Sequence, residues 1–241
     1  MCKFNAIDLF CGAGGLSLGF QQAGFNIIVG VDNEPAALET FEFNHKGAIG
    51  LNADLSKQET FDLILKTAGD RKIDVIIAGP PCQGFSLTGP RNFDDPRNKL
   101  YLAVIEMVKQ YSPKGFVIEN VPGMATMYKG QVKDEVLKRF TEMGYNVDCR
   151  ILKACDYGVP QMRKRLVFMG VRKDIGEPHF PEATFGPETQ KPYRTCRDAI
   201  SDLPKRINDL GKNEDEYVKP AETEYQLLMR GNCSILYNHI A

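Results

Sequence analysis

The chain contains no tryptophan, only three histidines and no Cys-x-x-C pair among its seven cysteines. An odd number of cysteines at such spacings does not predict a disulfide framework. The histidines, at positions 45, 179 and 239, stand apart in the sequence and do not have the spacing of a zinc site. We therefore expect no disulfide bonds and no metal.

Two further absences narrow the class of protein. No apolar run approaches the roughly 18 residues of a membrane helix, and a strand-like segment stands where a signal peptide would begin. The formal net charge is −1, so the chain lacks the overall basic excess of a stand-alone nucleic-acid binder, although Lys and Arg are concentrated between residues 153 and 173. We expect an intracellular, monomeric protein with no membrane partner.

Short apolar runs alternate with helical patterns over the first 150 residues. The predicted strands are residues 5–10, 25–32, 48–54, 73–78 and 115–121. The predicted helices are residues 16–22, 34–45, 97–111 and 132–143, the last ended by Gly144. This alternation predicts an α/β fold with a doubly wound, Rossmann-like sheet.

The rest of the chain changes in character. Two last strands, at residues 146–152 and 166–171, are joined without an obvious helix, which predicts an antiparallel pair and hence an antiparallel edge strand on a mostly parallel sheet. Prolines interrupt any long element after residue 174, and the final stretch is polar without a strong period. We predict one domain over residues 1–174, and a linker with the start of a second region over residues 175–241.

The segment DLFCGAGGLS, at residues 8–17, joins the first predicted strand to the first helix. Glycines let a backbone approach a ligand closely, but such a turn alone could equally pack a helix tightly. Glu34, at the end of the second strand, stands where a carboxylate can accept both hydroxyl protons of a ribose. Asp54, at the end of the third strand, could accept from an adenine amino group or could be a turn or helix-capping aspartate. Cys11 is interpreted as a small packed side chain.

A dinucleotide oxidoreductase is the competing interpretation of this turn. Its G-x-G-x-x-G pattern would need glycine at Ser17, counting from Gly12 and Gly14. An adenosine ligand without a pyrophosphate fits better, and S-adenosylmethionine is the most common such ligand for this order of elements. The three strand ends therefore predict one adenosine-sized site, of the S-adenosylmethionine-dependent methyltransferase type.

The run Gly-Pro-Pro-Cys-Gln-Gly-Phe-Ser, at residues 79–86, sets a thiol just beyond a buried strand. Two prolines fix the backbone φ and cannot extend a ladder. Cys82 would therefore be held in one orientation at the edge where open α/β sheets bind ligands. A buried structural cysteine is the alternative; a rigid thiol at this edge favours catalysis.

Two more groups of polar residues are predicted near this edge. Glu119 ends the strand expected to lie beside the one that carries Cys82, so a carboxyl and a thiol would face one pocket. Gln161, Arg163 and Arg165 alternate and would share one side of an extended segment. A solvated basic strand edge is the alternative for these three.

Residues 8–20, 79–86, 119–121 and 161–165 together resemble the ordered motifs of the DNA cytosine-5 methyltransferases. The resemblance implies methyl transfer from S-adenosylmethionine, which leaves as S-adenosylhomocysteine, to carbon 5 of cytosine in double-stranded DNA. It implies that the target cytosine is flipped out of the duplex. It also implies a location with DNA, in the cytoplasm or in a eukaryotic nucleus, and a cognate restriction endonuclease as a functional partner.

The resemblance assigns catalytic and substrate-binding roles to particular residues. Cys82 is implied as the nucleophile that adds to carbon 6, Glu119 as the group that bonds ring N3, and Arg163 with Arg165 as ring-binding and supporting groups. The other implied substrate contacts are Pro80, Gln83, Ser86, Arg97 and Gln161.

Cofactor roles follow from the same resemblance. Phe10 is implied to stack on the adenine, Glu34 to hold the ribose and Asp54 to hold the adenine amino group. The other implied cofactor contacts are Gly12, Gly14, Gly15, Leu16, Asp32, Leu55 and Pro80. Pro35 departs from the pattern, because family members often carry a bulky aromatic residue there.

Two alternatives stay open: an RNA cytosine-5 methyltransferase acting on tRNA, and an inactive methyltransferase-like module that binds nucleic acid. The Gln-Gly-Phe-Ser continuation after Cys82 resembles the DNA enzymes, and the presence of all the motif residues disfavours an inactive module. Family members usually continue with a target-recognition domain and two further motifs, which are not found in this sequence. We therefore expect a truncated chain that binds DNA poorly and has little activity.

Overall fold

A computed structural model describes residues 4–81, 100–204, 214–231 and 233–237. The chain divides into two compact units. Unit 1 comprises Met1–Leu152 and Arg165–Phe180, and unit 2 comprises Lys153–Lys164 and Pro181–Ala241. The second unit thus includes a short segment from the middle of the sequence.

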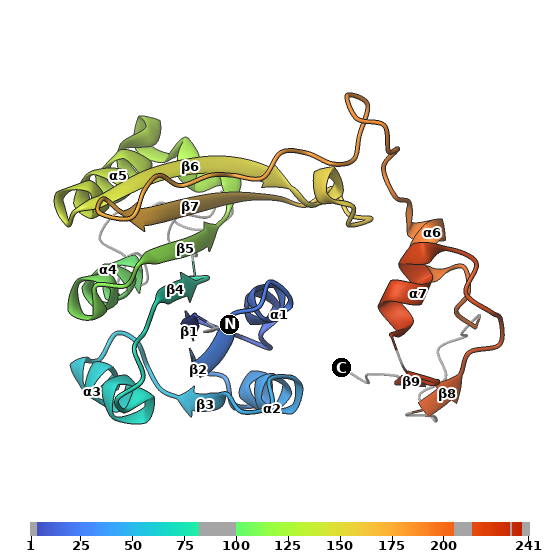
Figure 1. Cartoon of the computed structure of the whole chain (residues 1–241), viewed down its shortest axis with the longest axis horizontal. Helices are drawn as coiled ribbons and strands as arrows, with labels where there is room; N and C mark the ends of the chain where they lie inside the picture. Colours follow the sequence, from blue (N-terminus) through green and yellow to red (C-terminus); the bar gives the residue numbers. More distant parts are fainter. Residues whose placement is uncertain (1–3, 82–99, 205–213, 232, 238–241) are drawn as a thin grey trace. The chain divides into compact units, whose positions relative to one another are not determined.

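A seven-stranded sheet in the order β3-β2-β1-β4-β5-β7-β6 forms the centre of unit 1 (Figure 1). Its strands are β1 Asn5–Leu9, β2 Asn26–Asp32, β3 Ile49–Asn52, β4 Val75–Ala78, β5 Gly115–Asn120, β6 Tyr145–Lys153 and β7 Lys164–Arg172. Strands β1 to β5 run parallel, and β7 pairs with β5 in the antiparallel direction. The structure confirms the doubly wound sheet and the antiparallel addition at one edge.

Helices cover both faces of this sheet. They are α1 Gly15–Gln22, α2 Pro35–Asn44, α3 Gln58–Ala68, α4 Leu100–Tyr111 and α5 Gln131–Glu142. Helices α1 and α2 lie on one face, and α3, α4 and α5 lie on the other (Figure 1). Each face has its own apolar core, the smaller one around Phe41 and the larger one around Phe116 and Phe140. None of the helices in the described residues is long and apolar enough to cross a membrane.

The sequence pattern predicted most of these elements but missed α3 and shifted several ends. The segment between Asp54 and Ile73 had no predicted helix, although Phe61, Ile64 and Ala68 are buried at helical spacing. Strand β2 ends at Asp32 and β3 at Asn52, so neither Glu34 nor Asp54 ends a strand. Both carboxylates instead lie in the connections to the following helices, where side chains can cap backbone N–H groups.

Unit 2 contains short elements, and those after residue 180 lie in the part of the chain predicted to be a linker and the start of a second region. They are the 3₁₀ turn η5 Ala154–Tyr157, helices α6 Cys196–Ile200 and α7 Glu224–Arg230, and the paired strands β8 Glu214–Glu216 and β9 Ile235–Tyr237. Capping boxes begin both helices, with Thr195 and Asp198 at α6 and Thr223 and Gln226 at α7. A Thr followed three positions later by Asp or Gln is a sequence signal for the start of such a helix, so the nearby prolines do not exclude short helices.

Candidate functional site

The glycine-rich connection between β1 and α1 has a backbone that few side chains could adopt. Phe10 has φ 60°, a left-handed conformation that is unusual for an aromatic residue, and Gly12 and Gly14 also have positive φ. A Cβ added at Gly12 or Gly15 would meet no atom within 4 Å, so open space borders the loop. Strain of this kind in a loop that faces open space is typical of a ligand-binding site.

Hydrogen bonds to β2 fix this loop in place. The Cys11 N–H donates to the Val31 carbonyl at 3.0 Å, and the Gly12 N–H donates to Asp32 Oδ2 at 2.8 Å. Asp32 Oδ1 also accepts from the Glu34 N–H at 3.0 Å. Asp32 thus joins the glycine loop to the start of α2, which places three of the predicted cofactor residues within one hydrogen-bonded group.

Glu34 is the N-cap of α2, and Pro35 stands at the first helical position, where its missing N–H is not needed. The Glu34 side chain is exposed and accepts from the Ala36 N–H at 3.4 Å. This long hydrogen bond can be exchanged for one to a ligand hydroxyl. The capping role does not therefore exclude the predicted ribose contact.

Asp54 lies beside a hollow of about 380 Å³ at the ends of β2 and β3. The hollow is lined by Asn33, Asn52, Ala53, Asp54, Lys57, Glu59, Thr60 and Leu63. The Ser56 backbone N–H, 2.9 Å from Oδ1, lowers the pKa of Asp54, so the exposed carboxyl is ionised and can accept further hydrogen bonds. Leu55, by contrast, is only 3% exposed and packs into the core.

The ends of β1, β4 and β5 meet beyond the glycine loop. The Gly79 N–H donates to the Leu9 carbonyl at 3.1 Å, and a Cβ at Gly79 would lie 3.9 Å from the Phe10 carbonyl oxygen and 4.0 Å from Glu119 Oε2. Asn120, only 4% exposed, donates from Nδ2 to the Pro80 carbonyl at 3.4 Å. This amide ties the end of β5 to the proline turn that leads to Cys82.

Glu119 forms an ion pair with Arg165, whose Nε lies 2.5 Å from Glu119 Oε1. In the ladder, Glu119 is opposite Val167, so Arg165 is its diagonal neighbour on the same face of the sheet. The pairing depends on the antiparallel direction of β7, because only then does the beginning of β7 lie beside the end of β5. Both side chains are about one-third exposed, so the pair is open to a ligand.

The prediction that Gln161, Arg163 and Arg165 share one extended segment is wrong for the residues before Lys164. Strand β7 begins at Lys164, and Gln161 lies in a bend in which its N–H donates to the Val159 carbonyl at 2.8 Å. Gln161 and Arg163 are exposed and belong to unit 2, whereas Arg165 belongs to unit 1. The predicted residues Cys82, Gln83, Ser86 and Arg97 lie outside the described residues.

Several buried polar residues behind the glycine loop were not predicted. Ser17 donates to Asp8 Oδ2 at 2.6 Å beneath the loop, and burial raises the pKa of Asp8 to about 7. His45 contacts the Gly14 carbonyl from the end of α2. A polar residue inside a buried strand such as Asp8 is the available sequence signal, since an unpaired buried carboxyl is costly. Cys11 is buried as predicted, and burial raises the pKa of its thiol.

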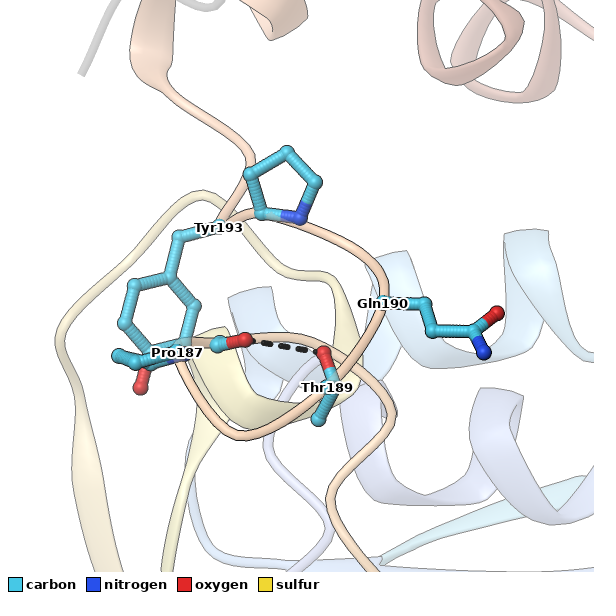
Figure 2. Close-up of a pocket in the computed structure, with 6 residues that line it drawn as sticks. Pro187, Thr189, Gln190 and Tyr193 are labelled. Carbon is cyan, nitrogen blue, oxygen red and sulfur yellow. Dashed lines mark hydrogen bonds between the residues drawn. The ribbon is translucent and has the colours of Figure 1, made fainter.

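Unit 2 has a separate pocket of about 400 Å³ in the turn around Thr189. Figure 2 shows the Thr189 hydroxyl donating to the Gly186 carbonyl, at 3.0 Å, while Gln190 points away from the turn. The pocket is lined by Gly186, Pro187, Thr189, Gln190, Pro192 and Tyr193, none of which is a predicted site residue. Among the described residues of the chain, no group of three or more His, Cys, Asp or Glu side chains could hold a metal ion.

The strand order and the glycine-rich connection are those of the S-adenosylmethionine-dependent methyltransferase fold. A crystal structure of a DNA modification methyltransferase encoded within an E. coli prophage superposes with TM-score 0.76 at 31% identity, covering 93% of this chain and 63% of that one. Residues 4–232 match the C-5 cytosine-specific DNA methylase family. The chain belongs to this family.

Curated relatives agree with this assignment. The Type II methyltransferase M.AgeI of Thalassovita gelatinovora is 41% identical, in an alignment covering 98% of this chain and 60% of the relative. The Type II methyltransferase M.DdeI of Desulfomicrobium norvegicum is 39% identical, covering 98% of this chain and 57% of the relative. The chain thus spans somewhat more than half the length of these two relatives.

Proposed function

We propose that this chain carries the catalytic part of a DNA cytosine-5 methyltransferase, with the cofactor site and Glu119 in unit 1. The observation that carries the proposal is the Glu119–Arg165 ion pair at the end of β5, beside the proline turn that precedes Cys82. The family match and the Type II methyltransferase relatives support DNA as the substrate. Residues 175–241 are proposed to begin a target-recognition region.

The residues around the glycine loop suit S-adenosylmethionine. The open space at Gly12 and Gly15 gives room for the ligand, and Gly14 caps α1 without a side-chain hydrogen bond. We propose that Phe10, Glu34 and Asp54 contact the adenosine, with the remaining predicted cofactor residues, except the buried Leu55, forming the walls. When bound, S-adenosylmethionine supplies an electrophilic methyl group for carbon 5 and leaves as S-adenosylhomocysteine.

Cys82 is proposed to make carbon 5 nucleophilic. Its thiolate adds to carbon 6 of the cytosine, and the electrons of the C5–C6 double bond move toward carbon 5 and N3. Glu119 shares a proton with N3 and stabilises that charge as it develops, so it acts more strongly on the transition state than on the ground state. After methylation a base removes the proton on carbon 5, the double bond re-forms and the Cys82 thiolate leaves.

Three further side chains are proposed to keep Glu119, the cytosine ring and the turn before Cys82 in position. Arg165 fixes the orientation of the Glu119 carboxylate, and Arg163 binds the ring. Asn120 fixes the carbonyl of Pro80 two residues before Cys82. Because an atom inside a stacked duplex is out of reach, we propose that the cytosine is flipped out, at a cost of a few kcal/mol. Gln83, Ser86, Arg97 and Gln161 are proposed to contact the flipped nucleotide and its phosphates.

Trapping with 5-fluorocytosine tests this mechanism, because fluorine replaces the proton that must leave carbon 5. Duplexes that carry 5-fluorocytosine in varied sequence contexts are incubated with the chain and S-adenosylmethionine. We expect a covalent adduct stable to denaturation for the wild type and none for Cys82→Ser. Adduct formation by Cys82→Ser, or its absence from the wild type while a Type II methyltransferase relative forms it, contradicts the proposal.

Competition between labelled DNA and tRNA in the same assay distinguishes the RNA-directed alternative.

In the cell, we propose that the protein acts on cytoplasmic DNA as a monomer. A restriction endonuclease is its proposed functional partner, because the relatives are named as Type II methyltransferases.

A further inference from the structure

His45 is a buried histidine that connects three parts of unit 1. It is the C-cap of α2 and only 1% exposed. Its Nε2 lies 3.0 Å from the carbonyl oxygen of Gly14, the N-cap of α1, and its Nδ1 lies 2.7 Å from Oε1 of Gln21, in the last turn of α1. The ring therefore bridges the two ends of α1 from the end of α2.

The protonation of this ring follows from its partners. A carbonyl oxygen can only accept, so the ring carries its proton on Nε2 and donates to Gly14. Burial lowers the pKa of His45, which keeps the ring neutral and leaves Nδ1 as an acceptor. The Gln21 amide then presents its NH₂ group to Nδ1, an orientation assigned here from the hydrogen-bond network.

The hydrogen bond from His45 to the Gly14 carbonyl restricts the glycine loop more than the first hydrogen bond of α1 does by itself. The Gly14 carbonyl accepts from the Leu18 N–H at 2.9 Å and from the imidazole, so both of its lone pairs are used. The Gly14 N–H donates to the Cys11 carbonyl at 2.9 Å, and a Cβ at Gly14 would overlap the His45 ring. The imidazole thus sets the orientation of the peptide that joins the glycine loop to α1.

We infer that His45 is a positioning residue for cofactor binding: its Nε2–H holds the Gly14 carbonyl, and this fixes the glycine loop in the conformation that receives the cofactor. The inference rests on the proposed function. A phenylalanine would fill the same space beside Phe41, whose ring centroid is 4.7 Å from that of His45, without the cost of burying two polar nitrogens. The polar ring is explained by the peptide that it holds.

Two substitutions separate hydrogen bonding from packing. His45→Phe keeps an aromatic ring of similar size but removes the donor, whereas His45→Gln places an amide NH₂ at about the position of Nε2. His179→Phe, at an exposed histidine of unit 1, is the matched control. Titration of the whole chain with S-adenosylhomocysteine, followed by NMR, gives the dissociation constant, and hydrogen exchange of the Leu18 amide reports on the loop without ligand.

For His45→Phe we expect at least fivefold weaker binding and faster exchange at Leu18, with His45→Gln and the control within twofold of wild type. Equal binding by all variants would overturn the inference while leaving the proposed function intact. Equal losses in both His45 variants, matching their losses in global stability, would also overturn it and assign the ring a structural role only. Failure of the wild type to bind removes the cofactor proposal and the inference with it.

Discussion

Asp8 shows how one residue can link the stability of this protein to pH. Its carboxyl is 1% exposed in the middle of the sheet, where burial outweighs the Ser17 hydrogen bond and raises its pKa from 3.8 to about 7. The negative charge of Asp32 contributes in the same direction. Folding therefore favours the protonated form of Asp8.

Asp8→Asn removes the ionisable group and keeps an acceptor for Ser17. The unfolded carboxyl ionises near its ordinary pKa of 3.8 and the folded one near 7, so wild-type stability falls as the pH rises through this window and is level above it. The variant should gain stability relative to wild type from pH 4 to 7, by ~1.4 kcal/mol for each pKa unit between the two states. Urea unfolding at pH 5 and pH 8 measures the effect; an equal difference at both pH values contradicts it.

The Glu119–Arg165 pair allows a second prediction at this scale. Arg165→Lys keeps the positive charge but loses the planar guanidinium that orients the carboxylate. We expect 5-fluorocytosine adducts to form about tenfold more slowly, and about 100-fold more slowly in Glu119→Gln, because proton transfer contributes at least that factor. The S-adenosylhomocysteine dissociation constant should change less than twofold in both. A parallel loss of affinity would show that the pair acts on the cofactor instead.

At the scale of helices and strands, α7 depends on its capping box. Thr223 Oγ1 accepts from the Gln226 N–H at 3.1 Å and donates to the Asp198 carbonyl at 2.9 Å, so it also connects α7 to α6. The Gln226 side chain is 1% exposed and accepts from the Glu222 and Thr223 N–H groups. These contacts stabilise two helices that are short for independent folding.

Thr223→Ala should destabilise α7 by about 1–2 kcal/mol, because a buried network loses its cap. Thr223→Ser keeps the hydroxyl and should lose less than half as much. Hydrogen exchange of the α7 amides measures the change locally, with the β1 amides of unit 1 as the internal reference. Similar exchange in the alanine and serine variants would show that the hydroxyl does not stabilise the helix.

The sequence predicted those helices, strands and turns whose signal lies within a few consecutive residues. Apolar runs such as Ile76–Ala78 identify buried strands because no helical period competes with them, and glycines mark the turn into α1. Helix α3 was missed although its pattern is regular: Phe61, Ile64 and Ala68 share the buried face, and the charged residues around Asp62 lie on the opposite face. The Arg165 contact with Glu119 was not predictable in detail, because strand direction and register arise from pairing between distant segments. The His45 contact with Gly14 likewise joins residues far apart in the sequence.

For the whole molecule, electrostatics predict weak association with nucleic acid. The formal net charge is −1, so few counterions are released from DNA unless basic groups gather on one surface. We expect micromolar or weaker affinity for a duplex at 200 mM salt, with a shallow salt dependence. Fluorescence anisotropy at 50 and 200 mM salt measures both quantities. Nanomolar binding with a steep slope would reveal a basic surface that net charge conceals.

The antiparallel direction of β7 limits which insertions the catalytic site can tolerate during evolution. If β7 ran parallel to β5, its first residues would lie beside the beginning of β5. At ~3.3 Å per residue, they would then be about 20 Å from the Glu119 carboxylate. A one-residue slip would turn Arg165 through to the opposite face. An insertion between Arg165 and Val167 should therefore separate the guanidinium from Glu119 and abolish catalysis without unfolding the protein.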